Sequence, residues 1–284
     1  MSERLDPMKC IHLNPEEIDI ESYFRKRGFN LLLTQAKFNG LRALWRSSEG
    51  LFTRGDHPIT SVPHITARLE EHLPFVNVDG ELYHPTMDFN NINGAVRRKE
   101  PTDNSLKLEY HVFDRLIEDV SQQNRLAHNK FDLAKLSKDS FINRVPTNEV
   151  TPGHLDFALR LYLSRGFEGM IVRAPEAYYR EGRHVGNLWA IKPVYEIEAM
   201  FLGFLPPGEG TSLHQDTFGS LLLKLPNGRT FSCAGLSDTE RTSLWNSSLE
   251  EGTWITIKFG AWSHKHPDKA VPLYPRFKCV RWDK

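Results

Sequence analysis

Lys37 is the residue whose type and setting point most directly to chemistry. It closes the apolar stretch LLLTQAK and precedes Asn39-Gly40, a pair typical of a tight turn. A neutral amine is a nucleophile, whereas an ammonium is not. Burial in an apolar strand and the positive charge of Arg42 would both lower the pKa of Lys37 from its ordinary value of about 10.4. On this segment alone, however, a plain β-hairpin is the stronger interpretation.

Two carboxylates stand in apolar, strand-like surroundings. Glu81 follows Asp79-Gly80, and an unpaired carboxylate in such a strand is costly. We expect Glu81 to recognise a hydroxyl or to bind a metal, although Asp79-Gly80 by itself also fits a hairpin turn. Glu168 lies at the mouth of the apolar segment GMIVRA, with Arg173 beyond it.

An aromatic residue and a second lysine are the remaining candidates for the site. Phe113, next to Asp114, has the type of side chain that stacks on a base, although a core position is the simpler interpretation. Lys192 ends LWAIKP, where a snorkelling edge lysine is the alternative. Carboxylates and cations converging on Lys37 would suit a triphosphate with Mg²⁺. The sequence has neither GxxxxGK[ST] nor a strand–GxGxxG–helix pattern, so a nucleotide would bind in another way.

Short apolar segments separated by turn signals must position these residues. Alternation and turn residues predict strands over 31–37, 41–45, 51–55, 75–83, 109–116, 169–174 and 188–193. Helical spacing predicts helices over 15–27, 65–72 and 152–165. After residue 196 the pattern predicts five short strands, a hairpin at Asn227-Gly228 and one helix over 238–245, which suits a small OB-type barrel. We therefore expect one domain over 1–195 and another over 196–284.

Composition limits the class of protein. The chain has 284 residues, 39% hydrophobic and 25% charged, which excludes wholesale disorder and fits two globular domains. It lacks a long apolar run and a secretory signal, so we expect no membrane association and a cytoplasmic location. Three scattered cysteines give no disulfide or zinc framework. The net charge is zero, but from Lys258 onward the chain has seven cations and two acids. This basic end is either a solvated chain end or a surface that contacts a polyanion.

The order and spacing of these segments resemble the ATP-dependent DNA ligases of the covalent nucleotidyltransferase superfamily. The resemblance runs from about residue 30 to the end of the chain. It rests on seven segments. Lys37–Arg42 is similar to the family's KxDGxR motif, Thr53–Gly55 to its Ser-Arg strand, Asp79–Leu82 to its DGEL motif and Tyr110–Asp114 to its aromatic strand. Glu168–Val172 is similar to the EG-hydrophobic motif, Lys192-Pro193 to the lysine motif and Arg281–Lys284 to the Arg-x-Asp-Lys motif. It implies an α+β fold: an adenylation (nucleotidyltransferase) domain of antiparallel sheets with flanking helices, followed by an OB-type β-barrel.

The resemblance also implies a reaction. Lys37 would attack the α-phosphate of ATP, AMP would pass from the lysine to the 5′-phosphate at a nick in duplex DNA, and the 3′-hydroxyl would displace it. The implied partner is nicked double-stranded DNA, bound by a monomer, with ATP and Mg²⁺ or Mn²⁺ as cofactors.

The same resemblance assigns roles to individual residues. Glu81 would contact the ribose and Phe113 would stack on adenine. Arg42 and Arg54 would bind AMP or the nick phosphate, and Lys192 the α-phosphate. The remaining expected residues are Gln35 and Arg173 for the cofactor, Glu168 and Glu81 for the metal, and Arg281, Asp283 and Lys284 for orienting pyrophosphate.

Two positions depart from the family pattern. Asn39 replaces the usual aspartate, and Ala190 stands where the first of two lysines is expected. These departures are the best support for one alternative, a non-catalytic nucleic-acid-binding module. A second alternative is an RNA ligase or a capping-type guanylyltransferase.

Overall fold

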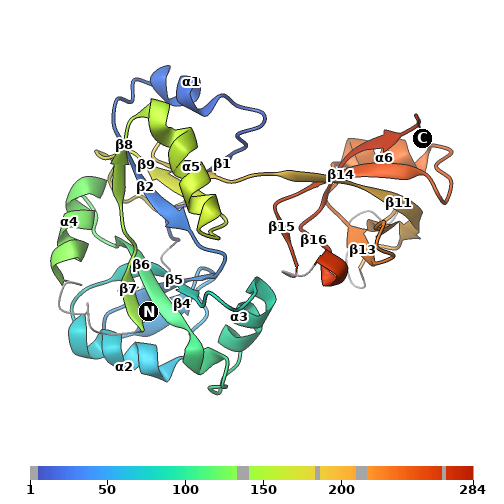
Figure 1. Ribbon diagram of the computed structural model, residues 1–284. Helices are drawn as coiled ribbons and strands as arrows, with labels where there is room; N and C mark the ends of the chain where they lie inside the picture. The colour runs from blue at the N-terminus through green and yellow to red at the C-terminus, as the bar shows by residue number, and fades with distance from the viewer. Residues whose placement is uncertain (1–5, 133–140, 183–185, 209–215, 264–266, 284) are drawn as a thin grey trace. The chain divides into compact units, whose positions relative to one another are not determined.

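Two five-stranded sheets carry most of the candidate residues. The computed structural model describes residues 6–132, 141–182, 186–208, 216–263 and 267–283 (Figure 1). By its internal contacts the chain divides into two compact units, Met1–Lys192 and Pro193–Lys284. Both sheets belong to the first unit. The functional assignment of residues 1–195 and 196–284 stays a prediction.

The first sheet is antiparallel except at one edge. Its strand order is β1-β10-β9-β2-β8, and only β1 and β10 run parallel. The strands are β1 (Ile11–Leu13), β10 (Leu188–Ile191), β9 (Gly169–Arg173), β2 (Leu32–Lys37) and β8 (Asn148–Val150). Alternate residues of β2 face opposite sides. Leu32 and Ala36 pack into an apolar core under helices, which leaves Gln35 and Lys37 on the other face.

The helices on the first sheet are α1 (Ile20–Arg25) and α5 (Leu155–Ser164), with the short helix η3 (Pro152–His154) before α5 (Figure 1). α1 is shorter than the predicted 15–27 because Asp19 caps it, its carboxylate accepting a hydrogen bond from Ser22 N at 3.1 Å. Phe24 and Leu155 pack with Trp189 in the core between helices and sheet.

The second sheet has the order β4-β3-β5-β6-β7, with only β6 and β7 parallel. Its strands are β4 (Gly50–Thr53), β3 (Leu41–Arg46), β5 (Val78–Tyr83), β6 (Glu109–Arg115) and β7 (Ile142–Arg144). Helices α2 (Pro63–His72) and α3 (Phe89–Val96) bury Ile65, Leu69 and Ile92 in its core. The remaining elements of the unit are η1 (Ser105–Lys107) and α4 (Gln122–Asp132).

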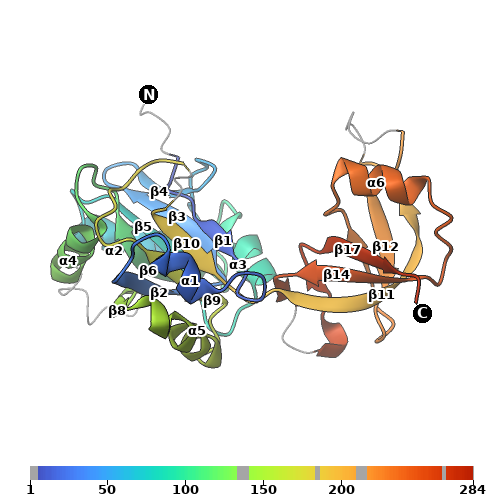
Figure 2. The same ribbon diagram turned by 90° about the horizontal axis from the view of Figure 1, so that it is seen from above.

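The second unit contains a five-stranded antiparallel sheet of order β13-β12-β11-β14-β17 (Figure 2). Its strands are β11 (Tyr195–Leu205), β12 (Ser220–Lys224), β13 (Thr230–Cys233), β14 (Trp254–Phe259) and β17 (Arg276–Arg281). The predicted hairpin at Asn227-Gly228 joins β12 to β13. The other elements are α6 (Asp238–Trp245), β15 (Ala261–Trp262), η4 (Pro267–Lys269) and β16 (Pro272–Leu273).

The edges of this sheet approach each other. An isolated bridge joins Gly235, just after β13, to Arg276 of β17, and Phe277 N donates to Gly235 O at 2.9 Å. The sheet is therefore OB-like, although no continuous ladder closes a barrel among the described residues. The predicted α+β class, with antiparallel sheets and flanking helices, is confirmed. No helix in the described part of the chain is long and apolar enough to cross a membrane.

Candidate active site

Lys37, Glu168 and Lys192 lie together at one end of the first sheet, where three adjacent strands begin or finish. Lys37 is the last residue of β2 and pairs with Gly169, the first residue of β9. Glu168 immediately precedes β9, and Lys192 immediately follows β10. Because β2, β9 and β10 are successive antiparallel neighbours, the end of one strand lies beside the start of the next. The convergence expected from the sequence is therefore present.

Glu168 links the two lysines through its two carboxylate oxygens. Lys192 Nζ donates to Oε1 at 2.6 Å, and Lys37 Nζ donates to Oε2. The backbone reinforces the contact, since Glu168 N donates to Lys37 O at 3.0 Å. All three side chains are partly buried, so the ion pairs are poorly screened yet open to a ligand.

The charge state of Lys37 differs from the expectation. Burial lowers its pKa, but Glu168 and then Glu81 raise it, and the net pKa lies above its ordinary value. For Glu168, burial raises the pKa, but Lys37 and Lys192 outweigh burial and lower it. The expected lowering of the Lys37 pKa by Arg42 is thus wrong, because the carboxylate of Glu168 lies nearest the amine.

The turn at Asn39-Gly40 connects the two sheets. β2 and β3 are not paired, so the hairpin interpretation is wrong. Gly40 N donates to Glu81 Oε1 at 3.2 Å, and a Cβ at position 40 would collide with the carbonyl oxygen of Leu82. Glycine is therefore required here for close approach to β5.

Glu81 faces the first sheet from β5. Burial raises its pKa to about 7, although Lys37 and Arg42 act in the opposite direction. The side chain is therefore about half protonated near neutral pH, and in that state it can both donate and accept hydrogen bonds.

Arg42 is held by the carboxylate of Asp79, a residue whose Asp-Gly sequence also fits a turn. Asp79 and Gly80 lie within β5, and Asp79 is fully buried. Arg42 donates to both Asp79 oxygens, at 2.9 and 2.5 Å, and to Met8 O at 2.7 Å. Tyr179 Oη donates to Asp79 at 3.2 Å. The guanidinium is consequently fixed beside Glu81, its neighbour in the β3–β5 register.

Phe113, on β6, lies near two guanidinium groups. The Cζ atoms of Arg42 and Arg173 are each 5.5 Å from the centre of its ring. The ring is partly buried, so part of its surface stays open for stacking.

Gln35 and Arg173 lie in a buried layer beneath Phe113. Gln35 Nε2 donates to Phe113 O and to Thr147 Oγ1, both at 3.0 Å. Arg173 Nε donates to Gln35 Oε1 at 2.9 Å, and Nη1 donates to Asp114 Oδ2 at 2.8 Å. Both side chains are almost completely buried. They support Phe113 from below, and their contact with a cofactor stays a prediction.

Other predicted residues lie elsewhere. Arg54 is exposed in the turn after β4. In the second unit, Arg281 donates to both Asp283 oxygens at 2.8 and 2.7 Å and pairs with Glu198, whereas Lys284 lies outside the described residues. Within the basic end, Lys278 donates to Glu196 at 2.6 Å, so part of its charge is neutralised inside the unit.

Sequence reasoning missed the partners of two arginines. Asp79 holds Arg42, while Asp114 holds Arg173 and also Arg125 of α4, which donates to Asp114 at 2.9 Å. A signal was present, since an acidic residue inside an apolar strand is costly unless a cation pairs with it.

The donor set suits a cation that arrives with a nucleotide. Mg²⁺ typically binds one or two carboxylates together with substrate phosphates. Glu168 and Glu81 both act on Lys37 electrostatically and offer two such carboxylates. Within the described ranges, no group of three or more His, Cys, Asp or Glu side chains is placed to hold a metal.

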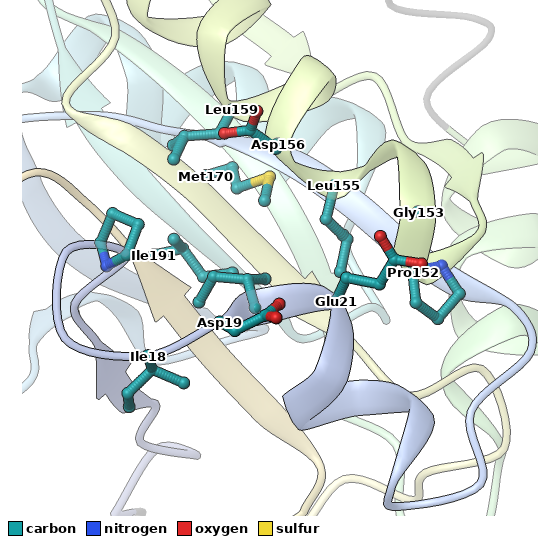
Figure 3. A pocket seen from close by; sticks show the side chains of 12 residues that line it. Ile18, Asp19, Glu21, Pro152, Gly153, Leu155, Asp156, Leu159, Met170 and Ile191 are labelled. Atoms are coloured by element: carbon teal, nitrogen blue, oxygen red, sulfur yellow. The ribbon is translucent and has the colours of Figure 1, made fainter.

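A separate hollow lies on the opposite face of the first sheet. It has a volume of about 250 Å³ and lies between α1 and α5, with Met170 and Ile191 in its lining (Figure 3). Met170 is adjacent in sequence to Gly169, the partner of Lys37, and Ile191 is adjacent to Lys192, so both side chains point to the opposite face from the site. The hollow is therefore distinct from the site at Lys37.

Comparisons with known proteins identify the family and the fold of the chain. A family model described as "ATP dependent DNA ligase domain" matches residues 7–192. No curated protein sequence matches the chain significantly. Among solved structures, a Lig E DNA ligase has 23% identity and a TM-score of 0.74, with 96% of this chain and 99% of that chain covered.

Two viral ligase structures are also similar. The Chlorella virus DNA ligase-adenylate has 22% identity and a TM-score of 0.55, with 99% of both chains covered. The ATP-dependent DNA ligase of bacteriophage T7, in complex with ATP, has 18% identity and a TM-score of 0.54, with 97% of this chain and 98% of that chain covered. At these identities the likeness supports the fold.

Proposed function

Because the chain belongs to the family of ATP-dependent DNA ligase domains, we propose that it seals nicks in duplex DNA through an AMP carried on Lys37. The observation that carries the proposal is the placement of Lys37 and Lys192 on the two oxygens of Glu168, at the ends of three adjacent strands. A nucleophile, a proton acceptor and a cation for phosphate thus share one edge of a sheet.

In the first step the Lys37 amine attacks the α-phosphorus of ATP. The Nζ lone pair forms the N–P bond while the bond from the α-phosphorus to the bridging oxygen breaks, and pyrophosphate leaves with that electron pair. Nζ must lose two protons, one to free its lone pair and one as the N–P bond forms. Glu168 Oε2, which already accepts a hydrogen bond from Nζ, would take the first, and solvent or the departing pyrophosphate would take the second. Lys192 would move from Glu168 to the α-phosphate oxygens and neutralise their charge.

In the second and third steps AMP passes to DNA and is released. A 5′-phosphate oxygen attacks the α-phosphorus, a new P–O–P linkage forms, and the N–P bond breaks to return the amine. The 3′-hydroxyl oxygen then attacks the phosphorus of the 5′-phosphate and loses its proton, and AMP leaves. Dividing the transfer into separate displacements replaces one difficult reaction with easier ones.

The second sheet would bind the nucleoside part of ATP. Phe113 would stack on adenine and Glu81 would contact the ribose hydroxyls; the partial burial of the Phe113 ring and the position of Glu81 on the adjacent strand support these roles. Arg42, fixed by Asp79, would receive AMP or the nick phosphate. A divalent cation held by Glu168 and Glu81 would supply further positive charge against the phosphates. Arg54 would bind AMP or the nick phosphate. Pyrophosphate would be oriented by Arg281, Asp283 and Lys284.

The decisive experiment is covalent labelling with α-³²P-labelled ATP and Mg²⁺. We expect the wild-type chain to retain label that is released by mild acid and stable to alkali, as a phosphoramidate is, and Lys37→Ala to retain none. Label that persists in Lys37→Ala would overturn the assignment of the nucleophile. Absence of label in the folded wild type would favour the non-catalytic binding module.

A substrate panel separates the related enzymes. Nicked duplexes with DNA or RNA strands, each offered with ATP or GTP, should be sealed fastest when both strands are DNA and the nucleotide is ATP. Preferential sealing of RNA would favour an RNA ligase, and covalent labelling by GTP would favour a capping-type enzyme. Light scattering with and without nicked DNA tests the proposed monomer.

A further inference from the structure

Four aromatic rings without a role in the proposed steps pack together beside Lys37. We call Phe38, Tyr83, His111 and Phe167 the aromatic cluster. Phe38 is its centre: ring centroids lie 5.1 Å from Tyr83, 4.5 Å from His111 and 5.2 Å from Phe167. The contacts with Tyr83 and Phe167 are edge-to-face, an arrangement that aromatic pairs prefer.

Two of these rings are covalent neighbours of the reacting groups. Phe38 follows Lys37 directly, and Phe167 directly precedes Glu168. Their contact therefore joins the two chain segments that carry the nucleophile and its proton acceptor. A change in the packing of either ring would move the adjacent Cα atom.

The other two rings are neighbours of Glu81. Tyr83 lies two residues further along β5, on the same face, and His111 is the direct cross-strand partner of Glu81 in β6. The aromatic cluster thus contacts both sheets. Phe38 and Phe167 pack against the core of the first sheet, and Tyr83 packs against the core of the second.

His111 contributes a neutral ring. Burial lowers its pKa to about 4, so the imidazole is uncharged at neutral pH. It packs against Phe38 with the planes tilted by 33°. Its Nε2 lies 3.2 Å from Glu109 Oε2, within the second sheet. Packing, and not proton transfer, is therefore what this histidine offers to the site.

We propose that the aromatic cluster, centred on Phe38, is a positioning element that fixes the end of the first sheet, which carries the Lys37 amine and the Glu168 carboxylate, against the strands of the second sheet beside Glu81. The inference rests on the proposed function. A lysine side chain has four flexible carbons, so its nitrogen reaches a fixed position only when the backbone beneath it is fixed. In-line attack on phosphorus is sensitive to such placement.

The test compares two reactions of the same enzyme. Formation of lysyl-AMP needs the Lys37 amine as nucleophile, whereas sealing of a nick that already carries AMP does not. In Phe38→Ala we expect the single-turnover rate of lysyl-AMP formation to fall about 100-fold. The ATP concentration that gives half of the maximal rate, and the rate at which the adenylated nick is sealed, should each change less than about threefold. Phe38→Tyr keeps the ring, and we expect it to stay within about threefold of wild type in both reactions.

Phe29 provides the matched control. It is also a half-buried ring that makes edge-to-face contacts, with Phe24 and Trp189, but it lies outside the aromatic cluster. We expect Phe29→Ala to lower the melting temperature without slowing lysyl-AMP formation at a temperature where the variant is folded. Should Phe38→Ala fail to fold, Phe38→Leu replaces it, with an expected decrease of about tenfold in lysyl-AMP formation alone.

Each outcome is decisive. Equal losses in both reactions, or a wild-type rate of lysyl-AMP formation in the folded Phe38 variant, would overturn the inference while the proposed function stands. Absence of lysyl-AMP in the wild type would overturn the proposed function and, with it, the inference.

Discussion

Two carboxylates in the first unit each lie between two cations, yet they differ in exposure and in the type of cation. The side chain of Glu168 is 11% exposed, between lysines that are 19% and 26% exposed. Asp114 is 1% exposed, between Arg125 and Arg173 at 0% and 4%. We call Glu168 with Lys37 and Lys192 the open cluster, because solvent reaches it. We call Asp114 with Arg125 and Arg173 the closed cluster, because solvent does not.

The closed cluster uses its hydrogen-bonding groups within the protein. Arg125 also donates to Gln122 Oε1 at 2.6 Å and to Val120 O at 2.6 Å, and Arg173 donates to Gln35. Arginine stays charged whatever its surroundings, so this network keeps one state. A lysine can lose its proton, and Lys37 and Lys192 have exposed surface to offer a substrate. The comparison indicates that exposure and cation type distinguish the structural cluster at Asp114 from the cluster at Glu168 that we propose to react.

Converting the open cluster to the chemistry of the closed one should give the largest effect. Lys37→Arg keeps the positive charge beside Glu168 but removes a nucleophile that can become neutral. We expect lysyl-AMP formation to fall more than about 1000-fold while the free energy of unfolding changes by less than about 1 kcal/mol. Labelling with ATP and urea unfolding measure the two quantities, and residual labelling above one per cent of wild type would contradict the assignment.

Breaking the closed cluster should affect stability most. Asp114→Asn leaves two buried guanidinium groups without their counter-charge, and we expect the free energy of unfolding to fall by about 3–5 kcal/mol. Urea unfolding of the first unit gives the value. A loss below about 1 kcal/mol would show that water or movement of α4 relieves the buried charge.

The matching change in the open cluster should reverse that balance. Glu168→Gln removes the proton acceptor of Lys37 but keeps its shape, so we expect lysyl-AMP formation to slow about 100-fold. Because the two lysines keep exposed surface through which water can reach their charges, we expect a smaller loss of stability than in Asp114→Asn, of about 1–2 kcal/mol. A stability loss as large as that of Asp114→Asn would remove the distinction between the clusters.

The smallest effect is a pH dependence that only the open cluster should produce. The pKa of Lys37 is raised, so its neutral fraction grows about tenfold per pH unit throughout the neutral range. We expect lysyl-AMP formation to accelerate with pH between 6.5 and 8.5 by up to about tenfold per unit.

The Glu168→Gln variant sharpens this measurement. Without the Glu168 carboxylate, the largest influence that raises the pKa of Lys37 is gone, while burial still lowers it and Glu81 opposes burial only in part. The pKa should therefore fall relative to wild type, and the rising limb should move to lower pH. A profile that is flat in both proteins would mean that the proton leaves Lys37 before or outside the measured step.

The residue pattern predicted the site better than it predicted the connections. Lys37, Glu81, Glu168 and Lys192 were expected to converge, and the structure places them together. Asn39-Gly40 by itself favours a hairpin, because turn chemistry describes a few residues and does not say which strands pair. β2 and β3 instead enter different sheets.

Buried partners were the main omission. Asp79-Gly80 by itself also fits a hairpin turn, but Asp79 lies inside β5, within the strand expected over 75–83, and its carboxylate pairs with Arg42. β1, α3 and α4 were also not predicted; α4 matters because it carries Arg125 to Asp114. Such pairs join residues far apart in the chain, so spacing along the sequence does not identify them.

The sequence by itself determined where the strands end and which charged residues stand at those ends, because alternation, turn residues and the cost of an isolated charge are local properties. Only the tertiary structure decided which carboxylate meets which cation, and how far each pair is exposed. That choice separates the lysines at Glu168 from the arginines at Asp114, since charge state and hydration depend on neighbours brought together from distant segments.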